Sequence, residues 1–136
     1  MLQPNKNSPN FANNCSKGDN STSMDYVEAY QLIMQQAHSS QDPSQVNLAD
    51  RLRQQKPPIP GQITTLLLAL KVLYEGLRGV TTLERSLVLA LYALVQDSQY
   101  WYDQGQKAGI DWPPLLEADL RRIAKSVQNI FSDRWD

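Results

Sequence analysis

The 136-residue sequence predicts an all-α fold: a small helical bundle of four to five helices with a disordered N-terminal tail. Two observations carry this prediction. Apolar residues recur at three- and four-residue steps through most of the chain after residue 22, which is the period of an amphipathic helix. No segment shows the sustained alternation of apolar and polar residues that a half-buried strand requires, and no hairpin dipeptide separates β-branched runs.

The predicted tail covers residues 1–22. It is rich in Asn, Ser, Lys, Gly and Pro, and Phe11 is its only aromatic residue. Such a segment cannot bury enough apolar surface to offset the entropy lost on ordering. We therefore expect a disordered tail, with a docking peptide anchored by Phe11 as the alternative, followed by one helical bundle domain over residues 23–136 whose core lies in residues 62–132.

Two helices are predicted before a proline-rich connector. The first spans about residues 23–40, with Thr22 as its expected N-cap, and apolar side chains repeat along it with a helical period. The second begins after Asp42, a capping residue that precedes Pro43, and ends near Gln55. The connector, residues 56–61, carries three prolines and is expected to be stiff and extended.

The three strongest helical patterns follow the connector. They cover about residues 62–78, residues 82–104 and the segment after Pro114. The apolar arc of the middle helix is wide, which predicts a central helix contacted on more than one side. Gly79 suits the position after a helix end, and residues 81–84 match a capping box. Because the gap between the first two helices is short, we expect them to lie antiparallel as an αα-hairpin.

Candidate catalytic, cofactor and metal residues are missing from the sequence pattern. The single histidine, His38, and the single cysteine, Cys15, stand in separate segments without the spacing of zinc ligands or of a nucleophile and its base. There is no P-loop and no dinucleotide-binding glycine motif. The carboxylates fit helix caps and ion pairs. The sequence therefore predicts a protein that is not an enzyme and that carries no cofactor.

Charge and hydropathy predict a cytoplasmic protein. Thirteen basic and fourteen acidic residues leave a net charge of −1, which provides no overall field to attract nucleic acid or an anionic membrane. The longest apolar run, Leu87–Val95, has nine residues, whereas a membrane span needs about twenty. The N-terminus lacks the apolar core of a signal peptide, and a lone cysteine fits a reducing compartment.

The most distinctive feature is an aromatic cluster of Tyr100, Trp101, Tyr102 and Trp112. Three consecutive aromatic residues on a helix cannot all face one core. One interpretation is that the two tryptophans close the end of the bundle while one tyrosine stays partly wet. The other is that these four residues bind another protein, since Tyr and Trp dominate interface hot spots. Our first hypothesis is a non-catalytic interaction module, an assembly or regulatory factor, and a homodimer through the apolar central helix is one form of it.

Two alternatives use other residues. A small DNA-binding regulator would use Arg121, Arg122 and Lys125 on the exposed side of the last helix. The pI of about 5.8 counts against this, as does the leucine-rich character of the most tightly linked helix pair. A small-ligand pocket among the aromatic residues is the other alternative.

The segments Tyr-Trp-Tyr-Asp-Gln-Gly at 100–105 and Ile-Asp-Trp-Pro-Pro-Leu-Leu at 110–116 carry a family resemblance. Over about residues 62–135 the chain resembles a family of small cyanobacterial helical proteins of unknown function, some of which bear the label dethiobiotin synthetase. A true dethiobiotin synthetase is an ATP-dependent α/β enzyme with a P-loop, and this sequence has neither the loop nor the strands. The resemblance implies a cyanobacterial cytosol and transfers no functional residue.

Overall fold

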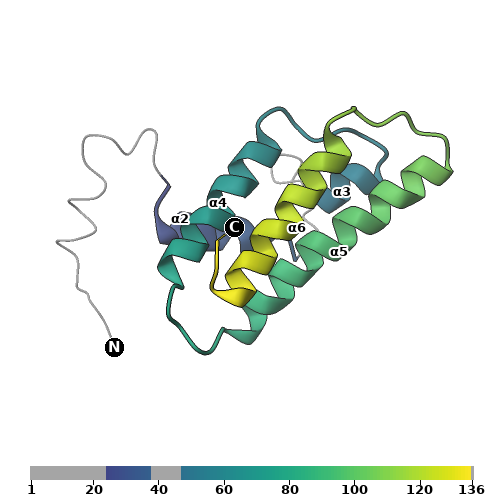
Figure 1. Ribbon diagram of the computed structural model, residues 1–136. Helices are drawn as coiled ribbons and strands as arrows, with labels where there is room; N and C mark the ends of the chain where they lie inside the picture. The colour runs from purple at the N-terminus through teal and green to yellow at the C-terminus, as the bar shows by residue number, and fades with distance from the viewer. Residues whose placement is uncertain (1–23, 38–46, 136) are drawn as a thin grey trace.

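The computed structural model describes residues 24–37 and 47–135, and within these ranges the chain is helical and contains no strand (Figure 1). The helices are α2 (Tyr26–Gln35), α3 (Leu48–Arg53), α4 (Gln62–Gly76), α5 (Arg85–Lys107) and α6 (Leu116–Ser132). This confirms the all-α prediction for these ranges. The predicted tail and the predicted cap Asp42 lie outside the described residues.

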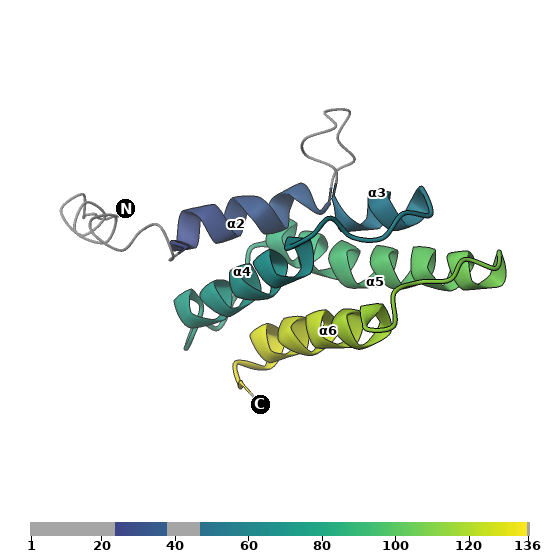
Figure 2. The ribbon, with the colours of Figure 1, turned by 90° about the horizontal axis from the view of Figure 1, so that it is seen from above.

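The helices form three layers (Figures 1 and 2). α2 and α3 make one outer layer, α6 makes the other, and α4 and α5 lie between them. α4 packs against α2 and α6, whereas α5 packs against α2, α3 and α6. The largest element, α5, therefore has three neighbours along its inner side.

The predicted αα-hairpin of α4 and α5 is wrong. α4 ends at Gly76 and α5 begins only at Arg85, so the link between them is longer than the sequence pattern indicated. The chain does reverse direction, but the two helices do not run side by side: α4 packs against α2 and α6, and α5 packs against α3, α2 and α6.

Polar side chains outside the apolar repeat mark the starts of the two short helices. Asp25 caps α2: its carboxylate accepts from the backbone N–H of Glu28 at 2.8 Å, while the Glu28 carboxylate accepts from the backbone N–H of Asp25 at 3.2 Å. This reciprocal pair is a capping box. Asn47 caps α3 by accepting from the backbone N–H of Asp50 at 2.8 Å. A helix of only six residues is stabilised mainly by such a cap and by packing against the rest of the protein.

The predicted capping box at residues 81–84 does not form. The residue before α5 is Glu84, and its side chain makes no capping hydrogen bond. One carboxylate oxygen accepts from the Tyr30 hydroxyl of α2 at 2.8 Å, and the other accepts from the Ser86 hydroxyl at 2.8 Å. A contact between helices thus occupies the carboxylate that the local pattern assigned to a cap.

The core extends beyond the predicted range of residues 62–132. Ile33 of α2, and Leu48 and Leu52 of α3, are as fully buried as the leucines of α4 and α5. They cover apolar faces of α4 and α5 that would otherwise be wet. The largest fully buried side chains come from all five of these helices: Ile33, Leu48, Leu52, Leu70, Leu73, Leu87, Leu91, Leu94, Ser98, Leu116 and Ile123.

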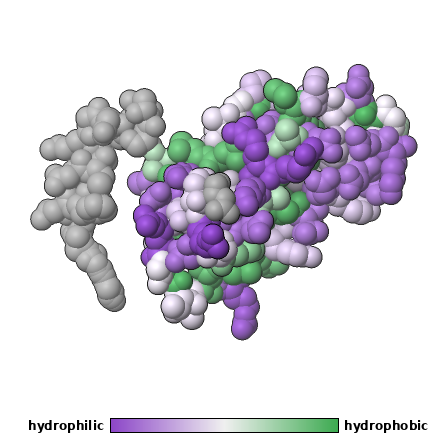
Figure 3. All heavy atoms as spheres, in the orientation of Figure 1, coloured by the Kyte–Doolittle hydropathy of each residue, from purple (hydrophilic) through white to green (hydrophobic). Residues whose placement is uncertain are grey.

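Hydrophobic side chains also reach the surface. On the face drawn in Figure 3 they form patches bounded by polar residues, and the C-terminal end of α5 is strongly polar. Among the described helices, none combines the length and the apolar character that crossing a bilayer demands.

Candidate protein-interaction surface on α5

The four aromatic residues singled out from the sequence divide into two pairs. Tyr102 and Trp112 are buried, with only 5% and 8% of their surfaces exposed. Their rings stack with centroids 6.1 Å apart, and the Trp112 indole N–H donates to the backbone carbonyl of Tyr102 at 3.0 Å. This pair belongs to the core of the described structure and keeps only a small exposed surface.

Local geometry explains why Trp112 turns inward. The helical residue facing its indole is Gly105, and a Cβ added there would lie 2.8 Å from both Cε2 and Nε1 of the ring. The backbone N–H of Ile110 donates to the Gly105 carbonyl at 2.9 Å, which folds the connector back onto α5. Desolvation at this position, with the nearby Glu117 carboxylate as a smaller cause, raises the pKa of the Tyr102 phenol.

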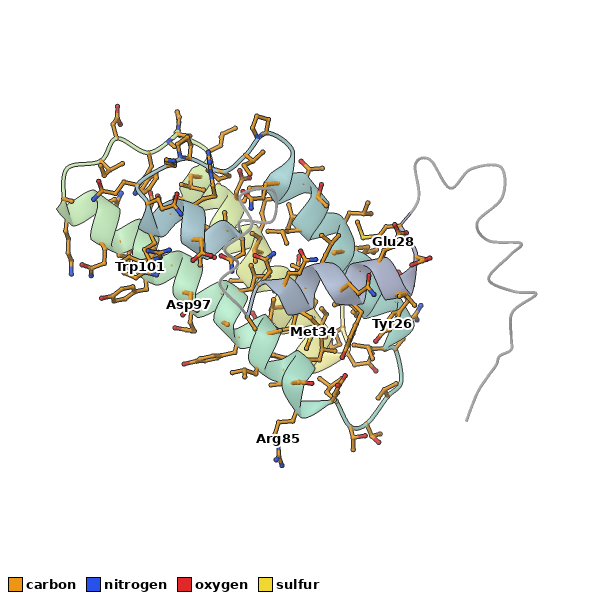
Figure 4. All side chains as sticks on the ribbon, turned by 180° about the vertical axis from the view of Figure 1, so that it is seen from behind. Tyr26, Glu28, Met34, Arg85, Asp97 and Trp101 are labelled. Atoms are coloured by element: carbon orange, nitrogen blue, oxygen red, sulfur yellow. The ribbon has the colours of Figure 1, made fainter. Side chains whose placement is uncertain are left out.

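Tyr100 and Trp101 lie differently. Their rings meet edge to face with centroids 4.8 Å apart, and Tyr100 is 53% exposed while Trp101 is half-buried. Figure 4 shows Trp101 and Asp97 on the same stretch of α5, with Arg85 directed away from the bundle at the start of the helix. Of the four predicted partner-binding residues, these two remain accessible.

The structure adds to Tyr100 a row of apolar side chains along the outside of α5. Leu89 is 60% exposed and Tyr92 is 58% exposed. With Gln96 and Tyr100 they follow steps of three and four residues, so they lie along one helical face. We call Leu89, Tyr92, Gln96 and Tyr100 the outer stripe. It lies opposite the buried stripe of α5, formed by Leu87, Leu91, Leu94, Ser98 and Tyr102.

The sequence analysis did not single out Leu89 or Tyr92 as exposed residues. The wide apolar arc of α5 predicted contacts on several sides, and α2, α3 and α6 do surround its inner side. The outer stripe stays uncovered by the described residues. A helical projection centred on Leu87, Leu91 and Leu94 places Leu89 on the far side, so that signal was available in the sequence.

The three basic residues of the DNA-binding alternative come together. Arg121, Arg122 and Lys125 line a groove of about 360 Å³, together with Leu67 of α4 and Trp135 after α6. The Lys71 ammonium of α4 lies 4.2 Å from the centroid of the Trp135 ring.

Acidic side chains reduce the net positive charge of this groove. Arg121 pairs with Glu117 at 3.6 Å, and Arg122 pairs with Asp119 at 3.3 Å. Both acids belong to the first turn of α6, where the helix dipole also favours them. The arginine charges in the groove are therefore partly neutralised.

A second hollow lies beside the buried aromatic pair. The connector after α3 and the one before α6 meet there, and the groove of about 340 Å³ is lined by Pro57, Pro113, Asp111 and the edge of Trp112, among others. This is the place for the small-ligand alternative, since Tyr102 and Trp112 themselves stack without a cavity between them.

Within residues 24–37 and 47–135, no three side chains among His, Cys, Asp and Glu are grouped so that they could hold a metal ion. His38 and Cys15 lie outside the described residues. No family model, curated protein or solved structure matches this chain.

Proposed function

We propose that this protein is a non-catalytic helical interaction module, an assembly or regulatory factor of the cytoplasm, that binds a protein partner through the outer stripe of α5. The observation that carries the proposal is the exposure of Leu89, Tyr92 and Tyr100, each more than half accessible, along one face of one helix. Exposed apolar residues gathered on one face mark interaction surfaces, and tyrosines supply much of the binding energy at such surfaces.

Rigidity supports the same assignment. α5 is 23 residues long, and its inner side is held by α2, α3 and α6. A side chain on such a helix loses little backbone freedom when it binds, so more of the contact energy remains for affinity. The edge-to-face contact with Trp101 further restricts the Tyr100 ring.

The non-catalytic part of the proposal rests on the sequence, in which one histidine and one cysteine offer no pattern for a reaction centre. The cyanobacterial origin belongs to the proposal through the family resemblance alone.

Co-purification tests the proposed surface. The tagged full-length chain is compared with Leu89→Ser and Tyr92→Ser in lysate of the source cell, and recovered proteins are quantified by mass spectrometry. The matched control is Leu68→Ser, which removes an exposed leucine from α4 instead. We expect a specific partner to fall at least tenfold with the stripe variants and to stay with the control, circular dichroism being unchanged. Equal recovery with all variants would overturn the proposal.

A second candidate function is supported by the basic groove, where Arg121, Arg122 and Lys125 share one hollow with the Trp135 ring. An anionic ligand such as duplex DNA would contact these side chains through phosphates. Fluorescence anisotropy of a labelled duplex at low salt tests it, with Arg122→Gln and Lys125→Gln as variants. Binding that weakens with salt and with both substitutions is the expected result, and no binding at low salt removes this candidate.

A further inference from the structure

We infer that the partner of the outer stripe is a second copy of this chain, with the two α5 helices antiparallel across a twofold axis so that Arg85 of each copy faces Asp103 of the other. This inference rests on the proposed function and names its partner. It follows from the order of side chains along the stripe, from the charges at its two ends and from their lack of partners.

The order of side chains is close to self-complementary. Reading along the exposed face from the start of α5, a cation is followed by the outer stripe, whose polar member is Gln96, and then by an anion: Arg85, Leu89, Tyr92, Gln96, Tyr100 and Asp103. When a second copy is reversed about residue 94, the cation meets the anion. Leu89 then lies beside Tyr100 of the other copy, and Tyr92 beside Gln96. A twofold interface requires this kind of self-complementary patch.

The two end charges find no opposite charge within the described structure. Arg85 and Asp103 are exposed, and neither forms an ion pair with a described residue; the Asp103 carboxylate accepts only from the Gln99 amide, at 3.0 Å. They are about 27 Å apart along the helix axis, at about 1.5 Å per residue, so they cannot pair within one molecule. An antiparallel copy pairs both at once, whereas a parallel copy would set like charges together.

Helix stability does not account for Arg85. It is the first residue of α5, where the helix dipole favours an acidic side chain and disfavours a cation. Replacing Arg85 by an acid should therefore leave the monomer at least as stable as before. An effect of that substitution on association can then be assigned to the contact between copies.

The small size of the contact, which involves one helix from each copy, determines the expected affinity of the dimer. This contact covers less than the roughly 800 Å² per partner of a standard stable interface. We therefore expect a reversible dimer with a Kd on the order of 10 µM, weakened by salt because its ion pairs lie at the rim.

A charge swap on the full-length chain tests both partner and orientation. Sedimentation velocity is recorded from 1 to 200 µM for the wild type, Arg85→Glu, Asp103→Arg and the double swap. Each single substitution sets like charges together at both ends, so we expect dimerisation at least tenfold weaker. The double swap restores both pairs with reversed sign and should recover affinity to within about threefold of the wild type. The matched control exchanges Glu75 and Arg78 at the end of α4, an exposed pair outside α5, and should leave association unchanged.

Two results would overturn the inference. One is a wild type that stays monomeric to 200 µM. The other is a dimer whose affinity does not change with either single substitution, or whose affinity is not restored by the double swap. Neither result overturns the proposed function, which fails separately if Leu89→Ser and Tyr92→Ser leave the recovery of every co-purified protein unchanged.

Discussion

The indole of Trp112 reaches the interior because Gly105 has no side chain to block it. The ring stacks on Tyr102 and donates to the carbonyl of that residue, so one glycine decides which member of the aromatic cluster is buried. Tyr100, only two positions earlier, has no comparable receptor on the bundle and stays on the surface. Amino-acid composition alone could not predict that Tyr102 is buried and Tyr100 is exposed.

Gly105→Ala is expected to destabilise the protein by about 2 kcal/mol, because the new methyl group would overlap the packed indole. This would occur despite the gain of up to about 1 kcal/mol that alanine brings to a helix interior. Urea unfolding followed by tryptophan fluorescence measures the loss.

A double-mutant cycle provides the control for this prediction. With Trp112→Leu in the background, the cost of Gly105→Ala should shrink, since the smaller side chain relieves the overlap. Additive effects in the cycle would contradict the proposed contact.

At the scale of the elements, the start of α5 is tied to α2 rather than capped locally. The Glu84 carboxylate accepts from the Tyr30 hydroxyl and from the Ser86 hydroxyl, and these hydrogen bonds, the Tyr30 bond first, lower the pKa of Glu84. The same Glu84 hydrogen bond raises the pKa of Tyr30 above its ordinary value. The link between α4 and α5 is thereby held to a helix far away in sequence.

Tyr30→Phe should therefore raise the pKa of Glu84 toward its ordinary value of 4.5, as measured by NMR titration of the side-chain carboxyl. Because the folded-state pKa of Glu84 is lowered, its contribution to stability is present above pH 4.5 and is lost as the pH falls through the lowered value. The stability difference between wild type and Tyr30→Phe should shrink over that range. For Tyr30, whose pKa is raised, the contribution is present below pH 10.0 and is lost as the pH rises through the raised value.

Tyr26→Phe is the matched control, since Tyr26 lies near Glu84 but its own pKa is raised mainly by burial and only then by that charge. It should leave the hydrogen bonds of Glu84 intact. A titration of Glu84 that does not respond to Tyr30→Phe would refute the assignment.

For the molecule as a whole, neighbouring leucines of α5 have opposite roles. Leu91 is fully buried and belongs to the core that unites all five described helices, whereas Leu89 lies on the outer stripe. The same residue type therefore contributes to folding at one position and is available for binding at the other.

Leu91→Ala should lower the free energy of unfolding by about 3 kcal/mol, since it leaves a cavity in a packed core. Leu89→Ala should change it by no more than about 0.5 kcal/mol, because the side chain is already wet. Urea denaturation near 1 µM, where the inferred dimer is dissociated, compares the two. Similar losses for both variants would mean that the outer stripe is covered in solution.

Local patterning predicted α4, α5 and α6 to within a few residues, because apolar side chains at helical spacing and breakers such as Gly79 act on neighbours in the chain. It also placed Arg121, Arg122 and Lys125 on one side of the last helix, and the structure finds them in one groove. It did not identify the outer stripe, although a helical projection places Leu89 opposite Leu87, Leu91 and Leu94.

The helical character of the chain and the positions of its main helices could be predicted from the sequence, since helix formation depends on contacts three and four residues apart. Packing between distant segments fixes which helices contact each other, that Glu84 accepts from Tyr30 instead of capping α5, and that Tyr102 turns inward while Tyr100 faces out. Those outcomes depend on close fits between distant segments, such as Gly105 against Trp112, and no local pattern records them.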